Sequence, residues 1–181
     1  PNDFVPSVKP SIYNALSKDP SNPLLPRAFR SAYPPGSTFK TFVGFAGLET
    51  GRINAKETFT CPTSFSVGDH VFRNWKKEDA GRLNFRQALT QSCNTWFYQA
   101  GLKIGAEPII DYAKRLGLGR RTGIPLRSEA GGNIPDDDYM LRVHKRTIKG
   151  GDIANMAIGQ GDILISPLQM AQAMSVMANG G

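Results

Sequence analysis

Apolar residues recur at helical spacing along most of this chain and alternate in only one short tract. The clearest helical stretch follows the triplet Pro34-Pro35-Gly36, which cannot itself be helical. Its apolar positions lie three or four residues apart and are Phe39, Phe42, Val43 and Ala46. Gly51 then supplies a stop signal, so the pattern predicts a helix with Ser37 at its N-terminus.

The same spacing, together with start and stop residues, predicts several more helices. A short candidate covers Ser11 to Leu16, within an extended segment of residues 1–36 that is rich in Pro, Ser and Asn. Later helices are predicted from the cap Asn84 to about Thr90, after Asn94 with Trp96, Phe97, Ala100 and Ile104 as apolar positions, from Pro108 in a first turn to Gly117, and over Asp137 to Lys145. Residues 117–136 are predicted to form a loop.

The last predicted helix has the best-defined start. The run Ser166-Pro167-Leu168-Gln169 combines an N-cap, a first-turn proline and a capping-box glutamine. Its expected apolar face consists of Leu168, Met170, Ala171, Met174 and Met177. Partial alternation is confined to Glu57 to Arg73 and predicts a small hairpin or two short strands. The chain is therefore expected to be mainly α-helical with a few short strands.

Composition indicates a folded domain or part of one: 181 residues, 40% hydrophobic, with both charge signs present. The formal net charge of +7 is scattered in short clusters without a nucleic-acid-binding motif, which favours a solvated basic surface over a nucleic-acid partner. The sequence contains no run of about twenty apolar residues and no export signal. Cys61 and Cys93 form neither a disulfide framework nor a paired metal motif.

The sharpest chemical signal is Ser37-Thr38-Phe39-Lys40. Residues three apart on a helix lie on the same side, which brings the Ser37 hydroxyl and the Lys40 amine within reach of each other. The amine can take the hydroxyl proton only if burial or a nearby cation lowers its pKa. Gly44 and Gly47, near the same side, permit a neighbouring element to pack closely. Taken alone, the pattern is equally compatible with a capping serine followed by a solvated lysine.

The second signal is Ser92-Cys93-Asn94, between two predicted helices. Residues two apart point to different sides of a helix, so Ser92 and Asn94 can face one site only if the chain leaves helical geometry there. We therefore predict a helix break at these residues. The hydroxyl can then relay a proton and the amide can orient the lysine or a substrate carbonyl. Alone, a polar turn with an asparagine cap is the simpler interpretation.

Taken together and in order, the motifs favour a catalytic interpretation over a purely structural one. The run Tyr33-Pro34-Pro35-Gly36-Ser37-Thr38-Phe39-Lys40, followed by Ser92-Cys93-Asn94 and then Phe97-Tyr98, resembles the class B penicillin-binding proteins, especially the elongation type. Further family-like stretches extend this resemblance over nearly the whole chain: residues 22–28, 123–126, 157–161 and 166–170.

The resemblance implies a penicillin-binding protein or serine β-lactamase-like transpeptidase fold, α+β in the intact domain. It also implies a peptidoglycan D,D-transpeptidase that cross-links stem peptides and is acylated by β-lactams. By match of motif, Ser37 is the nucleophile, Lys40 the acylation base, Ser92 the proton relay and Asn94 the orienting amide. No cofactor is implied. Expected partners are stem peptides, β-lactams and other cell-wall synthesis proteins of the elongation machinery, at the periplasmic face of the inner membrane.

Two departures from the family pattern stand out. The third motif, Lys-Thr-Gly or a close variant on a strand, is missing, and Arg121-Thr122-Gly123 lies in a loop context that we do not assign to the site. Where some relatives look to carry Cys, Asp and His metal ligands, this chain has Cys61, Asn74 and Ala80. One thiolate does not hold zinc, so no metal is expected, although His70 keeps a site open.

We expect residues 1–181 to be a fragment of a single transpeptidase domain, mostly its helical lobe, with an anchor upstream and further strands on either side. Exposed core surface would then favour a homodimer. Two alternatives remain: a catalytically incomplete or non-catalytic penicillin-binding module, and a serine β-lactamase or β-lactam sensor domain that shares Ser-x-x-Lys.

Overall fold

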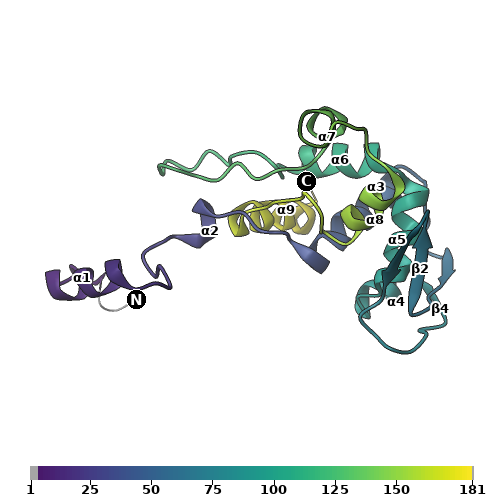
Figure 1. Ribbon diagram of the computed structural model, residues 1–181, viewed down its shortest axis with the longest axis horizontal. Helices are drawn as coiled ribbons and strands as arrows, with labels where there is room; N and C mark the ends of the chain where they lie inside the picture. The colour runs from purple at the N-terminus through teal and green to yellow at the C-terminus, as the bar shows by residue number, and fades with distance from the viewer. Residues whose placement is uncertain (1–3, 181) are drawn as a thin grey trace.

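Helix α5 (Asn94–Ile104) is the element around which the body of the molecule packs. The computed structural model describes residues 4–180. Helices α3, α6 and α8 all contact α5, and strands β1, β2 and β3 lie beside it (Figure 1). The helices in chain order are α1 (Pro10–Lys18), α2 (Arg27–Arg30), the 3₁₀ helix η2 (Gly36–Phe39), α3 (Lys40–Glu49), α4 (Phe85–Thr90), α5, α6 (Ala106–Arg115), α7 (Asp137–His144), α8 (Gly150–Ala157) and α9 (Pro167–Asn179).

Four short strands form two antiparallel pairs. They are β1 (Thr58–Thr60), β2 (Ser64–Val67), β3 (His70–Arg73) and β4 (Arg82–Asn84). Strands β2 and β3 form the hairpin predicted for residues 57–73, whereas β1 pairs with β4, which lies outside that tract. Two isolated bridges, Tyr33 with Ile165 and Asn133 with Leu164, tie the N-terminal segment and the long loop to the start of α9.

Helix α1 projects away from the body and buries none of its residues (Figure 1). No helix within residues 4–180 is long and apolar enough to cross a membrane. The mainly helical character expected from the sequence is confirmed, and so are the helices predicted around residues 84–117 and 137–145.

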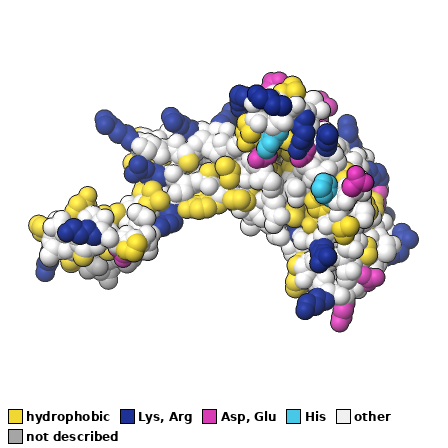
Figure 2. Space-filling view, viewed as in Figure 1, with side chains coloured by type: hydrophobic (Ala, Val, Ile, Leu, Met, Phe, Trp, Pro, Cys, Tyr) yellow, Lys and Arg dark blue, Asp and Glu magenta, His cyan; other side chains and the backbone are white. Residues whose placement is uncertain are grey.

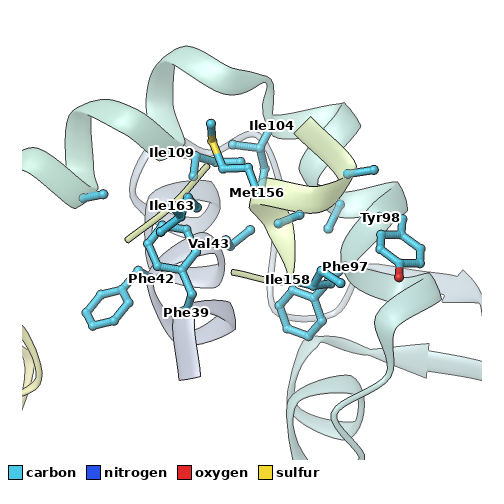
Figure 3. Packing of buried hydrophobic residues seen from close by; sticks show 14 of the residues in the cluster. Phe39, Phe42, Val43, Phe97, Tyr98, Ile104, Ile109, Met156, Ile158 and Ile163 are labelled. Atoms are coloured by element: carbon cyan, nitrogen blue, oxygen red, sulfur yellow. The ribbon is translucent and has the colours of Figure 1, made fainter. Parts of the chain in front are cut away.

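The core lies where α3, α5 and α8 meet. The buried cluster there includes Phe39, Phe42, Phe97, Ile158 and Ile163 (Figure 3). Two glycines of α3 make close approach possible, as expected from the sequence. A Cβ on Gly44 would lie 2.2 Å from the Phe85 ring, and one on Gly47 would lie 2.6 Å from Ile104.

Two helices are absent from the sequence prediction. Helix α2 has only four residues, too few to show a periodic pattern. Helix α8 begins with Gly150-Gly151, a pair that normally signals a loop, and buries mainly small side chains on its inner face. It forms because Gly150 and Gly101 let it approach neighbouring elements closely, which only the tertiary contacts reveal: a Cβ on Gly101 would lie 2.5 Å from Ala157.

The predicted cap of α9 is confirmed, and its predicted apolar face is correct in part: Met170 and Met177 pack against the core and Leu168 is half-buried. Ser166 and Gln169 form the capping box, yet Ala171 and Met174 are exposed while Gln169 and Ala173 are buried. The buried face contains a glutamine because its side-chain amide forms hydrogen bonds with backbone groups of the loop beside it. Its Nε2 donates to the carbonyls of Arg120 at 2.5 Å and Gly131 at 2.7 Å, and its Oε1 accepts from the Ser166 amide at 3.1 Å. A polar residue thus occupies a core position.

Replacing this glutamine with leucine should destabilise the fold strongly. Gln169→Leu keeps the shape but leaves two carbonyls and one amide without partners, which should lower the free energy of unfolding by about 3 kcal/mol. Urea unfolding followed by circular dichroism measures the loss. Gln172→Leu, at an exposed position of the same helix, is the matched control and should change stability little. Equal unfolding midpoints for the two variants would contradict this assignment.

Candidate active site

Ser37 lies in the 3₁₀ turn η2, immediately before α3, and its side chain is exposed. The sequence predicted a helix start at this point, and the structure refines it to a 3₁₀ turn that continues into the α-helix. The turn is fixed from outside, because the Gly36 amide donates to the carbonyl of Gly159 at 2.9 Å. The Thr38 hydroxyl closes it locally by donating to the Pro35 carbonyl at 2.7 Å. The Ser37 hydroxyl is therefore presented on a rigid turn that is open to an incoming molecule.

Lys40, one helical turn further on, is fully buried. Its ammonium group donates three hydrogen bonds: to the Ser92 carbonyl at 2.9 Å, the Ser92 Oγ at 3.0 Å and the Asn94 Oδ1 at 2.6 Å. The nitrogen also lies 5.3 Å from the centre of the Phe97 ring. A lysine in this setting has its three donors saturated and its orientation fixed.

Ser92 and Asn94 reach Lys40 together because the chain leaves helical geometry between α4 and α5. Ser92 has a φ of +51°, a left-handed conformation, and Cys93 is extended. Backbone bonds from Ser92 to Leu89 and from Cys93 to Ala88 close the end of α4 at 3.0 and 2.9 Å. The break predicted for these residues is therefore confirmed, and it turns both polar side chains toward Lys40.

The hydroxyl of Ser92 connects the lysine to the exposed serine. Ser92 Oγ donates to Ser37 Oγ at 2.9 Å and accepts from Lys40 Nζ at 3.0 Å. Among the hydrogen bonds of residues 4–180 there is none that joins Lys40 directly to Ser37, which differs from the direct contact expected from their spacing. The structure thus brings all four predicted residues together, in the order Ser37, Ser92, Lys40, Asn94.

Burial lowers the pKa of Lys40 from 10.5 to about 8, and a Coulombic interaction with Cys93 opposes part of this shift. With a pKa of about 8, about one tenth of the molecules carry a neutral Lys40 amine at pH 7. The neutral amine has a lone pair that can accept a proton from Ser92, which can in turn accept one from Ser37. The site can therefore deprotonate its exposed hydroxyl near neutral pH.

Asn74 belongs to this site, although its sequence position suggested only a comparison with metal ligands. Its Oδ1 accepts from the Asn94 amide at 3.0 Å, and its Nδ2 lies 3.7 Å from the Cys93 sulfur. It follows the last residue of β3, so no local pattern connects it with residues 92–94. An asparagine that ends a strand is too common a signal to single out from sequence.

The two cysteines are buried next to each other behind the site, and both are free thiols. A hydrogen bond with Cys93 raises the pKa of Cys61, with burial acting in the same direction, and the same hydrogen bond lowers the pKa of Cys93. Within residues 4–180 no three His, Cys, Asp or Glu side chains come together as a metal would require. His70 is exposed on β3.

The Arg121-Thr122-Gly123 segment lies in a loop. The carboxylate of Glu129 accepts from the Thr122 amide at 2.7 Å, the Thr122 hydroxyl at 2.6 Å and the Gly123 amide at 3.2 Å. These bonds lower the pKa of Glu129, the side-chain bond from Thr122 most of all. The triplet is thus part of a loop held by Glu129, outside any strand of the described chain.

Comparison with protein families gives one match over nearly all of the chain. The family described as penicillin binding protein transpeptidase domain matches residues 6–181. Among curated proteins, the peptidoglycan D,D-transpeptidase MrdA of Escherichia coli K12 is 34% identical over 183 residues. That alignment covers 100% of this chain and 29% of MrdA, so the chain spans less than a third of this relative.

Two solved structures extend the comparison. A complex between penicillin-binding protein PBP2 and MreC from Helicobacter pylori superposes with a TM-score of 0.87 at 36% identity, over 99% of this chain and 34% of that one. The penicillin G acyl-enzyme of penicillin-binding protein A from Mycobacterium tuberculosis gives a TM-score of 0.81 at 28% identity, over 94% of this chain and 38% of that one. The chain therefore resembles these proteins in both sequence and fold.

Proposed function

Since this chain belongs to the penicillin-binding protein transpeptidase domain family, we propose that it is the part of a peptidoglycan D,D-transpeptidase that carries the nucleophile and its base. The observation that carries the proposal is the hydrogen-bonded series from exposed Ser37 through Ser92 to buried Lys40. Transpeptidation requires an accessible hydroxyl and a base that is neutral in part of the molecules, and this arrangement supplies both.

In the proposed acylation, Ser37 Oγ attacks the carbonyl carbon of the penultimate D-alanine of a stem peptide. Its proton passes through Ser92 to the neutral amine of Lys40, and the terminal D-alanine leaves after its nitrogen takes that proton. In the second half, the amine of a neighbouring stem peptide attacks the ester, and Ser37 regains a proton. A β-lactam follows the first half only: its ring C–N bond opens as the ester to Ser37 forms.

The Ser37 backbone amide, at the start of a helix, is suited to stabilise the developing oxyanion. A second donor and the recognition of the substrate carboxylate are assigned to the family's third motif, which we place outside residues 1–181. These residues would then represent the helical lobe of a single transpeptidase domain.

The wider setting is proposed from the relatives. The Helicobacter pylori relative is solved in complex with MreC, which supports a role together with other cell-wall synthesis proteins of the elongation machinery. Because peptidoglycan is assembled outside the inner membrane, we place the site at the periplasmic face, with the anchor in a part of the protein upstream of this chain. Hydrophobic side chains gather over α2 and α9 (Figure 2), and this supports the homodimer expected from the sequence. The large hydrophobic side chains exposed in α9 and in the segments on either side of α2 are Leu25, Tyr33 and Met174. The mass of a monomer at all accessible concentrations in light scattering would count against a dimer.

Acylation by a fluorescent penicillin tests the function and its pH dependence together. Intact-mass spectrometry should find one adduct, absent in Ser37→Ala. The rate should rise with pH through about 8 and then level off, because the pKa of Lys40 is lowered to about 8 and only its neutral form accepts the proton. An adduct on folded Ser37→Ala, or a rate independent of pH between 6 and 9, would contradict the assigned roles.

The same assay on the full-length polypeptide separates two outcomes. If only the longer protein is acylated, the missing donor is needed for the reaction and residues 1–181 are an incomplete site. If neither is acylated although both are folded, the chain is a non-catalytic member of the family.

A further inference from the structure

The end of strand β3 lies against the turn that carries Ser92 and Asn94. Asn74 Oδ1 accepts a hydrogen bond from the backbone N–H of Asn94 at 3.0 Å, and the Arg73 carbonyl accepts one from Tyr98 Oη at 3.2 Å. The same carbonyl lies 3.5 Å from Asn94 Nδ2. Strand β3 itself is held by the hairpin, because the Asn74 amide donates to the Thr63 carbonyl at 2.7 Å. A fixed element therefore contacts the residue that holds Lys40.

Asn74 supplies a cap that helix α5 does not have locally. The first N–H groups of a helix have no partner inside it, and the N-cap residue normally accepts one of them. Here the N-cap is Cys93, whose side chain makes no capping hydrogen bond. The first helical amide, that of Asn94, is instead satisfied by Asn74 from another element.

We propose that Asn74 is a positioning residue of this site, which fixes the orientation of Asn94 and through it the amine of Lys40. Asn94 Oδ1 accepts from Lys40 Nζ at 2.6 Å, the shortest of the three bonds that this amine makes. If the Asn94 amide turned over, it would present N–H donors to an ammonium group, which has no acceptor. The contact of Asn94 Nδ2 with the Arg73 carbonyl disfavours that rotation, and the bond from the Asn94 backbone N–H to Asn74 Oδ1 fixes the backbone from which this side chain projects.

The amide of Asn74 is suited to this position because it both accepts and donates. Its oxygen accepts a hydrogen bond from the backbone N–H of Asn94, while its nitrogen donates to the Cys93 sulfur at 3.7 Å. An aspartate would keep the acceptor, lose the donor and add a negative charge. An alanine would remove both contacts. The two replacements are therefore expected to affect Lys40 in opposite directions.

The inference rests on the proposed function for its meaning, but its test does not require acylation. The titration of Lys40 can be followed in the full chain by NMR of its ¹³Cε, with a midpoint near the pKa of about 8. In Asn74→Ala, Asn94 is released and the ammonium loses its shortest bond, so the midpoint should fall by at least about 0.5 unit. In Asn74→Asp, the added charge should raise it by at least about 0.5 unit. Besides the substituted residue, the titratable group whose charge acts on Lys40 is Cys93, and Tyr98, one turn after Asn94 on α5, interacts with both Asn94 and Cys93.

The matched control is Asn133→Ala. Asn133 also bonds a backbone group, the Asp162 carbonyl at 2.8 Å, but belongs to the loop beside α9. It should lose similar stability and leave the Lys40 midpoint unchanged. If Asn74→Ala does not fold, Asn74→Gln replaces it, since this variant keeps the amide but displaces it by one carbon and should also lower the midpoint.

Acylation by a penicillin provides the second measurement. In Asn74→Ala the rate constant for acylation should fall about tenfold, whereas Asn74→Asp should recover most of it above pH 9, where Lys40 is again neutral. An Asn74→Ala variant with the wild-type midpoint and the wild-type rate would overturn the inference. If the midpoints separate as expected but no variant, including the wild type, is acylated, the positioning role stands and the proposed function fails for this chain.

Discussion

Lys40→Met should lower the rate of acylation by a penicillin by about a thousandfold and leave the protein folded. Methionine has a similar length and no proton-accepting group, so Ser92 would have no base to which it could pass a proton. The residual reaction should also lose its rise with pH through about 8, because that rise belongs to the titration of Lys40. Stopped-flow or gel-based kinetics with a fluorescent penicillin measures both effects.

Stability should change little in this variant, because two effects oppose each other. Lowering the pKa of Lys40 from 10.5 to about 8 corresponds to about 3 kcal/mol that the fold spends on burying the ammonium at neutral pH. Methionine removes that cost but leaves Ser92 and Asn94 oxygens without their donor, which costs a similar amount. In the wild type, stability should rise between pH 8 and 10.5, where the unfolded chain binds the proton and the folded one does not.

Lys103→Met is the control for removal of a lysine as such. Lys103 lies on α5, is half exposed and pairs with Glu57, whose side chain is 17% exposed. Its acylation rate should match that of the wild type. A folded Lys40→Met protein that is acylated within tenfold of the wild-type rate would show that Lys40 is not the base.

Gly159→Ala should destabilise the protein by about 3 kcal/mol or more. A Cβ at this position would lie 2.2 Å from the Gly36 carbonyl oxygen, 2.7 Å from Phe39 Cβ and 2.9 Å from the Gly36 nitrogen. These are backbone and core atoms that cannot move aside cheaply, and the φ of +68° adds the strain of a left-handed conformation. Urea unfolding monitored by circular dichroism gives the free energy directly.

A second glycine of nearly the same conformation separates the two causes. Gly51 has a φ of +67°, but a Cβ there would meet nothing within 4 Å. Gly51→Ala should therefore cost only the left-handed conformation, about 1 kcal/mol. Similar losses of unfolding free energy in the two variants would mean that the close approach of Gly159 to Gly36 and Phe39 does not contribute to stability.

The four site residues could be predicted because their signals are local. Ser37 and Lys40 share one helical turn, and the break around Ser92 follows from requiring that two residues spaced by two face the same site. A proton-accepting role for Lys40 requires a lowered pKa, and burial is one way to lower it. The structure shows that Lys40 is buried. Short-range patterns with a chemical condition attached thus singled out these residues, and the resemblance to a family decided between a catalytic and a merely structural interpretation.

The remaining features depend on contacts between distant segments. Asn74 caps a helix that begins twenty residues later, and no pattern in the sequence around Asn74 predicts that hydrogen bond. Gln169 occupies a core position of α9 because its amide nitrogen donates hydrogen bonds to carbonyls of the loop beside it, so the hydrophobic pattern missed this part of the buried face. Helix α8, with paired glycines at its start, forms through packing rather than propensity. Local periodicity carries no information about such contacts.

The hydrogen bond from Gly36 to Gly159, which holds the turn that carries Ser37, also has a consequence for biosynthesis. The turn is held by Gly159, and the segment before it pairs with Ile165, so both partners are translated long after Ser37. At typical elongation rates the ribosome needs on the order of ten seconds to cover that distance. During this interval the nascent chain already contains its serine and its lysine but not the residues that fix the turn. The hydroxyl thus acquires its final geometry only when almost the whole lobe has been made.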